Sequence, residues 1–248
     1  MSSTRRGHDD VFGRALLDWV NGGTTVEVLE RADGFAQLGA GPDVYLARFA
    51  HWPAAERQAI RTVRGRVLDV GCGAGRVALE LQGRGIEVVG LDTSPRAVRA
   101  ARLRGVRHVW RAPLEGLGRR LGAFDTFVLY GNNFGIFGTP RRARATLRAL
   151  ALATRPDARI VVESTSAYFG GAPGFDRSYY RLNRSRQIAP GQGRFRFRYE
   201  DLRGEWFNWL YVSPREMREV LVGTGWRQRQ VFSAGVSEPY VAVLEKST

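Results

Sequence analysis

Cysteine is nearly absent from this chain of 248 residues, in which Cys72 is the single example. An intramolecular disulfide is therefore excluded, and we expect a reducing, cytoplasmic location. No histidine lies near Cys72 in the sequence. A small side chain packed in a tight turn is thus favoured over a catalytic nucleophile.

Long apolar runs are also missing. No uninterrupted apolar stretch approaches the length of a membrane span. Arg5 and Arg6 are followed by acidic residues instead of an apolar segment, so we expect no signal peptide. The sequence therefore predicts no membrane partner.

Histidine is scarce, which limits the choice of a general base to three imidazoles. His8 belongs to the N-terminal tail, and His108 begins a predicted strand away from the expected site. His51 lies in a region expected to cover the site, where a structural role is the alternative to a base. No metal site is expected.

Acidic residues are outnumbered, and the net charge is +14 at pH 7. Of the 38 basic residues 37 are arginine, a bias that indicates a GC-rich coding sequence more than selection for a basic surface. The excess lies mostly in residues 61–160, where four arginines share one face of a predicted helix: Arg141, Arg144, Arg148 and Arg155. Nucleic acid is nevertheless the less favoured partner, because no nucleic-acid module is recognisable.

A glycine-rich turn is the most informative feature that is present. Residues 67–81 read as a short apolar strand, three alternate glycines at Gly71, Gly73 and Gly75, and a helix. Without Cβ atoms a ligand approaches the backbone closely, at a helix start where we expect unpaired N–H groups. A dinucleotide fingerprint requires glycine where this chain has Arg76, and no phosphate-loop motif occurs, so NAD and ATP are disfavoured.

A second apolar run, residues 86–91, ends on Asp92. At this spacing after the glycine turn a carboxylate accepts both hydroxyls of a ribose. The two strands, the turn and the acid therefore predict a nucleoside-binding unit.

Residues 69–75 (Asp-Val-Gly-Cys-Gly-Ala-Gly) and 90–95 (Gly-Leu-Asp-Thr-Ser-Pro) resemble two motifs of the class I S-adenosylmethionine-dependent methyltransferases. The resemblance runs from about residue 63 to 125 and, more weakly, from 160 to 245. It implies that the cofactor is S-adenosylmethionine, that the turn holds its methionine and ribose parts, that Asp69 faces its amino group and that Asp92 holds the ribose. The family's usual acid after the third strand is missing before Glu115, so backbone groups and Leu114 are expected to hold the adenine. The full set of expected cofactor contacts is Asp69, Gly71, Cys72, Gly73, Gly75, Asp92, Thr93, Leu114, Tyr130 and Asn132.

The pattern along the chain predicts an α/β fold with a Rossmann-like, doubly wound sheet. Parallel strands are expected at 66–70, 86–91, 107–110, 124–130 and 159–163, alternating with helices, and residues 226–232 and 240–245 add an antiparallel hairpin for seven strands in all. We expect one domain, residues 1–248, in four parts: an N-terminal helical lid (1–60), a cofactor-binding core (61–164), a substrate-side β insertion after the fifth strand (165–212) and a C-terminal helix and strand pair (213–248). Within these parts, residues 31–42 and 167–193 are predicted to be loops, and residues 43–64 are predicted to be helical.

Candidate acceptor-site residues come from the expected lid, the loop after the fourth strand and the insertion. The aromatic lid provides Tyr45 and Phe35, the loop at 131–138 provides Asn132 and Asn133, and the insertion provides Tyr179. The loop is not the Asn-Pro-Pro-Tyr motif, which weakens an amide-nitrogen substrate. Glu163 ends the fifth strand at the same edge and is the best candidate for a base or substrate contact; pairing with Arg181 or Arg198 is the alternative.

The leading hypothesis is methyl transfer to the oxygen, nitrogen or carbon of a small molecule, such as a secondary metabolite or modified peptide. An RNA or protein methyltransferase that uses the basic core is one alternative. A cofactor-binding protein without transfer activity is another. The sequence leaves the acceptor and the oligomeric state open.

Overall fold

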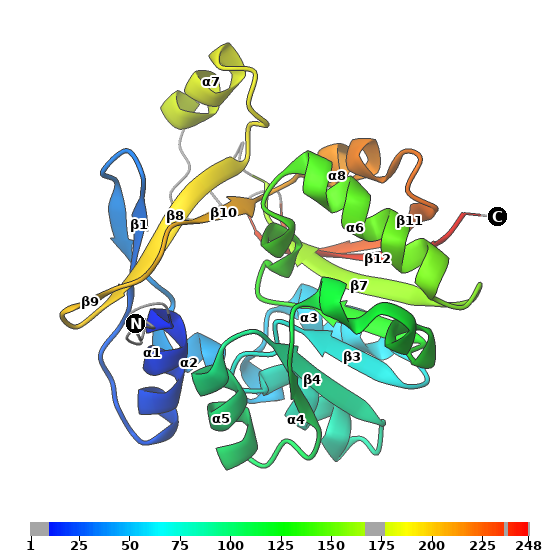
Figure 1. Ribbon diagram of the computed structural model, residues 1–248, viewed down its shortest axis with the longest axis horizontal. Coiled ribbons are helices and arrows are strands. Elements are labelled where there is room, and N and C mark those ends of the chain that lie inside the picture. Colours follow the sequence, from blue (N-terminus) through cyan, green and yellow to red (C-terminus); the bar gives the residue numbers. More distant parts are fainter. Residues whose placement is uncertain (1–9, 167–176, 236–237, 248) are drawn as a thin grey trace, which may run out of the picture.

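A computed structural model describes residues 10–166, 177–235 and 238–247. Residues 1–9 of the expected lid and 167–176 of the expected insertion lie outside these ranges. Within them the chain forms two separate sheets, a large one at the centre of the fold and a small one beside it (Figure 1).

The main sheet has the predicted topology. Its seven strands in the described ranges are β3 (Val67–Val70), β4 (Val88–Asp92), β5 (Val109–Arg111), β6 (Thr126–Leu129), β7 (Arg159–Ser164), β11 (Trp226–Ser233) and β12 (Tyr240–Lys246). Strands β3 to β7 are parallel in the order β7-β6-β3-β4-β5, and β12 and β11 add the antiparallel hairpin next to β7. The expected α/β, doubly wound sheet is confirmed.

Helices cover both faces of this sheet, which is why β3 and β6 are buried along their whole length. The covering elements are α4 (Arg76–Gly83), α5 (Pro95–Leu103), the 3-10 segment η3 (Leu114–Ala123), α6 (Pro140–Ala153) and α8 (Pro214–Leu221). Local sequence sets their starts: Ser94 and Thr139 accept backbone N–H groups at the N-termini of α5 and α6, and Ser213 with Glu216 forms a capping box on α8.

The N-terminal part is more broken than its sequence pattern predicts. Helix α1 (Val11–Val20) forms as expected, but the expected helix over 43–64 is divided into α2 (Gly41–Tyr45), η1 (Phe49–His51), α3 (Ala54–Ala59) and η2 (Ile60–Thr62). Arg48, Trp52 and Pro53 have extended ψ values, and proline disfavours helical backbone in the residue before it.

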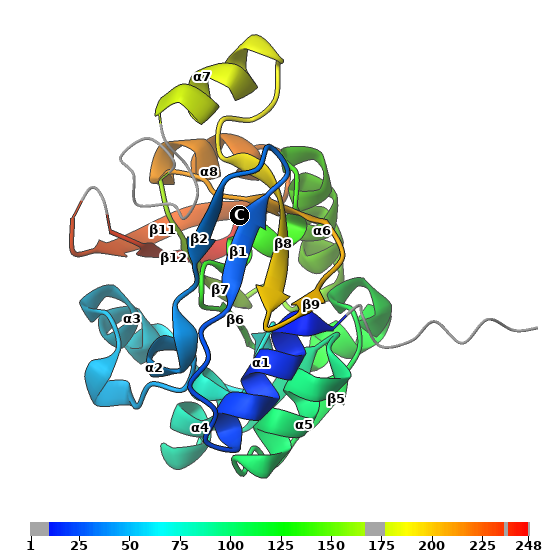
Figure 2. The ribbon, with the colours of Figure 1, turned by 90° about the vertical axis from the view of Figure 1, so that its left-hand side faces the viewer.

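The small sheet, which we call the cover sheet, joins segments far apart in the sequence. It contains β1 (Val28–Arg31), β2 (Ala36–Leu38), β8 (Gln192–Tyr199), β9 (Leu202–Arg203) and β10 (Phe207–Leu210), all antiparallel, in the order β10-β8-β1-β2 with β9 beside β8. The loop expected at 31–42 is therefore a hairpin, and the expected insertion forms a sheet of its own with the N-terminal part. Part of the loop expected at 167–193 is helix α7 (Arg177–Ser185). Figure 2 shows β1, β2 and β8 side by side.

The two faces of the cover sheet differ in chemistry. Along β8, Phe195, Phe197 and Tyr199 alternate with Arg194, Arg196 and Arg198. Cross-strand partners share a face, so the register assigns the following residues to what we call the aromatic face: Leu29, Arg31, Phe195, Phe197, Tyr199, Phe207 and Trp209. On the opposite, arginine face, Glu30 forms ion pairs with Arg196 and Arg198.

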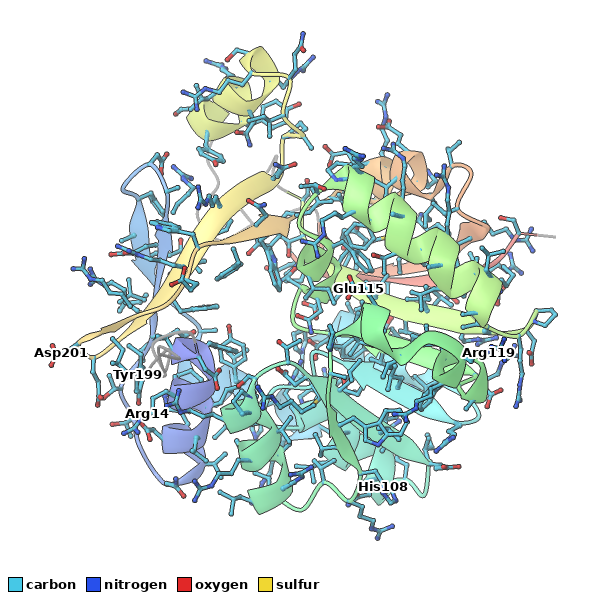
Figure 3. The ribbon with its side chains drawn as sticks, viewed as in Figure 1. Arg14, His108, Glu115, Arg119, Tyr199 and Asp201 are labelled. Carbon is cyan, nitrogen blue, oxygen red and sulfur yellow. The ribbon has the colours of Figure 1, made fainter. Side chains whose placement is uncertain are left out.

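The aromatic face packs toward the carboxyl edge of the main sheet. The Phe12 ring of α1 stacks on Phe197 with 4.5 Å between centroids. The Trp209 ring lies so close to Gly135, in the segment η4 (Asn133–Phe137) after β6, that a Cβ there would be 2.0 Å from it. Helix α1 in turn lies against the start of α5, because a Cβ at Gly13 would meet the Ser94 hydroxyl at 2.1 Å. Figure 3 labels Tyr199 beside α1, whereas His108 lies at the far edge of the main sheet.

Candidate active site

The glycine turn between β3 and α4 is hydrogen-bonded to the end of the neighbouring strand β4. Gly71, Gly73 and Gly75 all have positive φ (69°, 54° and 80°), which explains why glycine is needed there. The N–H groups of Gly71 and Cys72 donate to the Leu91 carbonyl at 2.8 and 3.0 Å, and that of Gly73 donates to Asp92 Oδ2 at 3.0 Å. The N–H groups of the turn itself are therefore paired, whereas the expectation of unpaired N–H groups concerned the start of the following helix α4. A turn of this kind leaves bare Cα surface for a nucleoside but is a poor cradle for phosphate.

Two carboxylates fix the turn. Asp69 is buried at the end of β3 and accepts the Ala78 N–H of α4 at 3.1 Å; burial raises its pKa to about 7. Asp92 bridges Gly73 and Ser94, whose N–H groups it accepts at 3.0 and 2.9 Å, and burial also raises its pKa. Each carboxylate oxygen has a second lone-pair site, so Asp92 retains acceptor capacity for a diol.

Cys72 packs against β4. A Cβ at Gly90 would lie only 2.9 Å from the Cys72 Sγ, so glycine is needed there. Burial raises the pKa of the thiol well above its usual value. The side chain is thus protonated and inert, as expected for a packing role.

The asparagine loop after β6 is tied to this turn. Asn133 Nδ2 donates to the carbonyls of Val70 and Gly71 at 3.0 and 3.1 Å. Asn132 has a left-handed backbone (φ 59°), and its Oδ1 accepts the Thr165 hydroxyl at 2.5 Å. The loop therefore joins the ends of β3, β6 and β7 at one edge of the main sheet.

A pair of glutamic acids lies at this edge. Glu163, 3% exposed at the end of β7, accepts the Gly131 N–H at 2.6 Å and is hydrogen-bonded to Glu56 of α3. Burial, and then the negative charge of Glu56, raise the pKa of Glu163 to about 8. The raised pKa means that Glu163 holds a proton to a higher pH than a free carboxyl group does.

Arg76 holds this pair in place. Its two Nη atoms donate to the two oxygens of Glu56 at 2.7 and 2.8 Å, and its guanidinium lies 4.4 Å from the centre of the Trp52 ring. The Tyr130 hydroxyl donates to the Glu56 carbonyl at 3.1 Å. The expected pairing of Glu163 with Arg198 is wrong, since Arg198 pairs with Glu30 on the cover sheet.

Tyr45 connects the acid pair with the aromatic residues above it. Its ring stacks on Trp19 (5.7 Å, 8° between planes) and meets Phe12 edge-on at 5.0 Å. Burial raises the pKa of its hydroxyl, which is also within electrostatic reach of Arg76 and Glu163. Tyr45 therefore packs with the aromatic residues of α1 and lies in the electrostatic field of Arg76 and Glu163.

Comparison with known proteins agrees with this geometry. Residues 67–157 match a family model described as a methyltransferase domain. An S-adenosylmethionine-dependent methyltransferase from Bacteroides fragilis, solved in complex with S-adenosyl-L-homocysteine, is 25% identical with a TM-score of 0.78, covering 97% of this chain and 96% of that one. Over its cofactor-binding core and in its fold, the chain is thus similar to the class I S-adenosylmethionine-dependent methyltransferases.

More distant structures support the fold of this methyltransferase. The CcbJ methyltransferase from Streptomyces caelestis is 15% identical with a TM-score of 0.58, over 80% of this chain and 98% of that one. An S-adenosylmethionine-dependent methyltransferase from Methanosarcina mazei is 17% identical with a TM-score of 0.59, over 75% and 96%. No curated protein matches the chain in sequence.

The remaining predicted site residues of the methyltransferase lie in three places. Leu114 is buried at the start of η3, and Thr93 is exposed after β4 with its carbonyl accepting from Arg111. His51 is exposed at the end of η1, in contrast to the buried Glu163. Phe35, just before β2, and Tyr179, on α7, both contact the Arg31 guanidinium.

Sequence reasoning missed three residues that shape this site: Glu56, Arg76 and Arg31. Arg76 was noticed only as the residue that breaks a dinucleotide fingerprint. Glu56 lies 20 residues before Arg76, and no local pattern links the two. Arg31 was assigned to a loop, and residues 28–31 (Val-Leu-Glu-Arg) carry no apolar alternation that would place it on one face of a strand.

The basic helix α6 is used in packing. Arg144 and Arg148 donate to the carbonyls of Glu219 and Gly223 beside α8, and Arg155 pairs with Asp125. Three of the four arginines proposed for nucleic acid thus have internal partners.

None of the helices in the described ranges combines the length and apolar character needed to cross a bilayer.

Proposed function

We propose that this methyltransferase modifies the oxygen, nitrogen or carbon of a small molecule, with secondary metabolites and modified peptides as the leading classes. The observation that supports this is the aromatic face of the cover sheet, which packs over the carboxyl edge that carries Glu163. Apolar rings at that position suit a small, largely apolar acceptor. A polyanion would require exposed cations there instead.

The turn and its neighbours are the proposed cofactor contacts. S-adenosylmethionine supplies an electrophilic methyl group on a sulfonium. Residues 69–75 would hold its methionine part, Asp92 and Thr93 its ribose, and Leu114 its adenine, while Tyr130 and Asn132 lie at the edge where the sulfonium is expected. The internally bonded N–H groups support a nucleoside without phosphate.

Tyr45 and Asn133 are the proposed acceptor contacts nearest to the chemistry. Tyr45 is half-buried between the aromatic cluster and the acid pair. Asn133 holds the loop after β6 on the glycine turn and so sets the position of that loop. Both residues would orient the acceptor in line with the methyl group, which is the main requirement of methyl transfer.

Glu163 is the proposed proton acceptor. With a pKa of about 8 its carboxylate form is a minority at neutral pH but is basic enough to take a proton from a hydroxyl or ammonium group. Glu56, held by Arg76, would orient it. The exposed position of His51 makes that residue the weaker candidate.

The test is a transfer assay with a library of small phenols, amines and carboxylic acids, in which S-adenosylhomocysteine and methylated product are both measured. We expect product with at least one small acceptor. We also expect Glu163→Gln to lower kcat by about 10²-fold or more while S-adenosylhomocysteine affinity is retained. Glu87→Gln, at an exposed glutamate that precedes β4 and pairs with Arg66, is the matched control.

Two other results would favour the alternatives. Product only with RNA, with binding that falls steeply with salt, would indicate a nucleic-acid methyltransferase. Cofactor binding without transfer to small molecules, RNA or proteins would indicate a non-catalytic protein.

A further inference from the structure

Arg31 is the one cation on the aromatic face among the described strands of the cover sheet. It lies opposite Phe195 in the β1/β8 register, whereas the arginines of β8 project from the other face. A charge among aromatic rings has a desolvation cost, so its position calls for a partner.

The surroundings of Arg31 are built around its guanidinium. The side chain is 6% exposed, and its Nε and Nη2 atoms donate to the two oxygens of Asp33 at 2.8 and 2.9 Å. The Tyr179 ring of α7 lies 3.8 Å from Cζ on one side, and the Phe35 ring lies 4.8 Å from it on the other. Asp33 and the two rings leave the second Nη atom as the available donor.

That atom, Nη1, is buried without a hydrogen-bond partner in the described part of the chain. A buried, unpaired donor on a charged group is unfavourable, because it has lost its hydrogen bonds to water without forming one to the protein. Guanidinium groups that keep a free donor recognise carboxylates well. The neighbouring Phe35 is 39% exposed, so its ring can shift at low cost to admit a ligand.

The aromatic cluster extends from Arg31 toward the proposed chemistry. Phe195 and Tyr211 form its buried centre, with Leu29, Tyr179, Phe207 and Trp209 packed around them. Tyr211 is within electrostatic reach of Glu163. The rings beside Arg31 and the acid pair are thus linked through Tyr211.

We propose that Arg31 binds a carboxylate of the acceptor through Nη1, while the apolar body of the acceptor lies on the aromatic face. This inference rests on the proposed function and adds the substrate class: a small, largely apolar or aromatic acid that carries a nucleophilic group at its far end. Phe35 and Tyr179 then contact the acceptor beside its carboxylate.

The test compares 4-hydroxycinnamate with its neutral amide, by calorimetry at saturating S-adenosylhomocysteine. We expect the unmodified chain to bind the acid at least tenfold more tightly than the amide. Arg31→Leu should remove this preference. Arg198→Leu, on the arginine face of the same sheet, should keep it.

A second variant separates recognition from a purely structural role. Asp33 is partly exposed, and Asp33→Asn removes the anion that competes for the guanidinium, so we expect the preference for the acid to rise at least threefold. Equal affinity of the two probes in the unmodified chain, including no detectable binding of either, would overturn the proposal. So would a preference that persists in Arg31→Leu. Affinity for S-adenosylhomocysteine is measured in every variant, since its loss in the unmodified chain would instead contradict the proposed function.

Discussion

The main sheet and the cover sheet assemble their functional groups over very different distances in the sequence. Asp69 reaches the backbone of Ala78, and Asp92 reaches Gly73, so the partners are 9 and 19 residues apart. In the cover sheet Glu30 pairs with Arg196 and Arg198, which are 166 and 168 residues away. The cofactor cradle is therefore a local unit, whereas the proposed acceptor surface exists only after the whole chain has folded.

The two sheets also bury their residues differently. The parallel strands of the main sheet are apolar on both faces, because helices cover both. The cover sheet has one aromatic and one arginine-rich face, as an antiparallel sheet allows. Changes in the main sheet should thus alter cofactor binding, and changes in the cover sheet should alter acceptor choice.

The largest expected effect is on the cradle. Gly73 has a φ of 54°, and a Cβ added to it would lie 3.5 Å from the Leu16 side chain of α1. Gly73→Val should weaken S-adenosylhomocysteine binding by about 100-fold or more, because a β-branched residue is strained there and fills the ligand's place. Calorimetry checks this, with Gly83→Val at the exposed end of α4 as the control. Tight binding by the Gly73 variant would show that the ligand lies elsewhere.

A smaller loss is expected for Asp92→Ala. Removing a charged acceptor from the ribose hydroxyls costs about 1.5 to 3 kcal/mol, or roughly 10- to 100-fold in affinity. The variant also loses the bonds that Asp92 accepts from Gly73 and Ser94, so its thermal unfolding is measured alongside the binding. Unchanged affinity would contradict the ribose assignment.

The acid groups of the main sheet should make stability depend on pH. The pKa of Glu163 is raised from 4.5 to about 8 and that of Asp69 from 3.8 to about 7, so the folded chain keeps protons that the unfolded chain has lost. Stability should therefore fall as pH rises from about 5 to 8, because unfolding releases these protons over that range. Glu163→Gln should show a shallower fall in the thermal midpoint. A midpoint that rises over this range would refute the assignment.

The smallest expected effect compares the two sheets directly. With S-adenosylhomocysteine alone, hydrogen exchange should slow chiefly in β3, β4 and the turn. With an acceptor also present it should slow about tenfold in β1, β8 and β10, because burial of the acceptor orders the cover. Equal exchange in the cover sheet with and without acceptor would contradict a role in substrate binding. So would full activity and selectivity in a chain that lacks residues 1–40.

Much of the cofactor side followed from local sequence. Three glycines with positive φ, the acid that ends β3 and the acid that ends β4 each lie within one strand-turn-helix unit, where spacing and geometry are tightly linked. The five parallel strands and the terminal hairpin were predicted from apolar periodicity for the same reason. The hydrogen-bond partners of the turn N–H groups were not predicted, because these partners lie on the next strand, β4.

The acceptor side was decided by tertiary structure. Alternation in β8 is visible in the sequence, but nothing in it says that β1 is the neighbouring strand or that Arg31 lies opposite Phe195. Pairing between strands this far apart depends on the packing of the cover sheet against α1 and η4. It does not follow from the local preference of any one strand. The sequence by itself determined the strand-turn-helix unit that we propose as the cofactor cradle. Only folding brought Glu56 to Glu163 and set Arg31 among aromatic rings, because those contacts join side chains whose separation along the chain carries no signal.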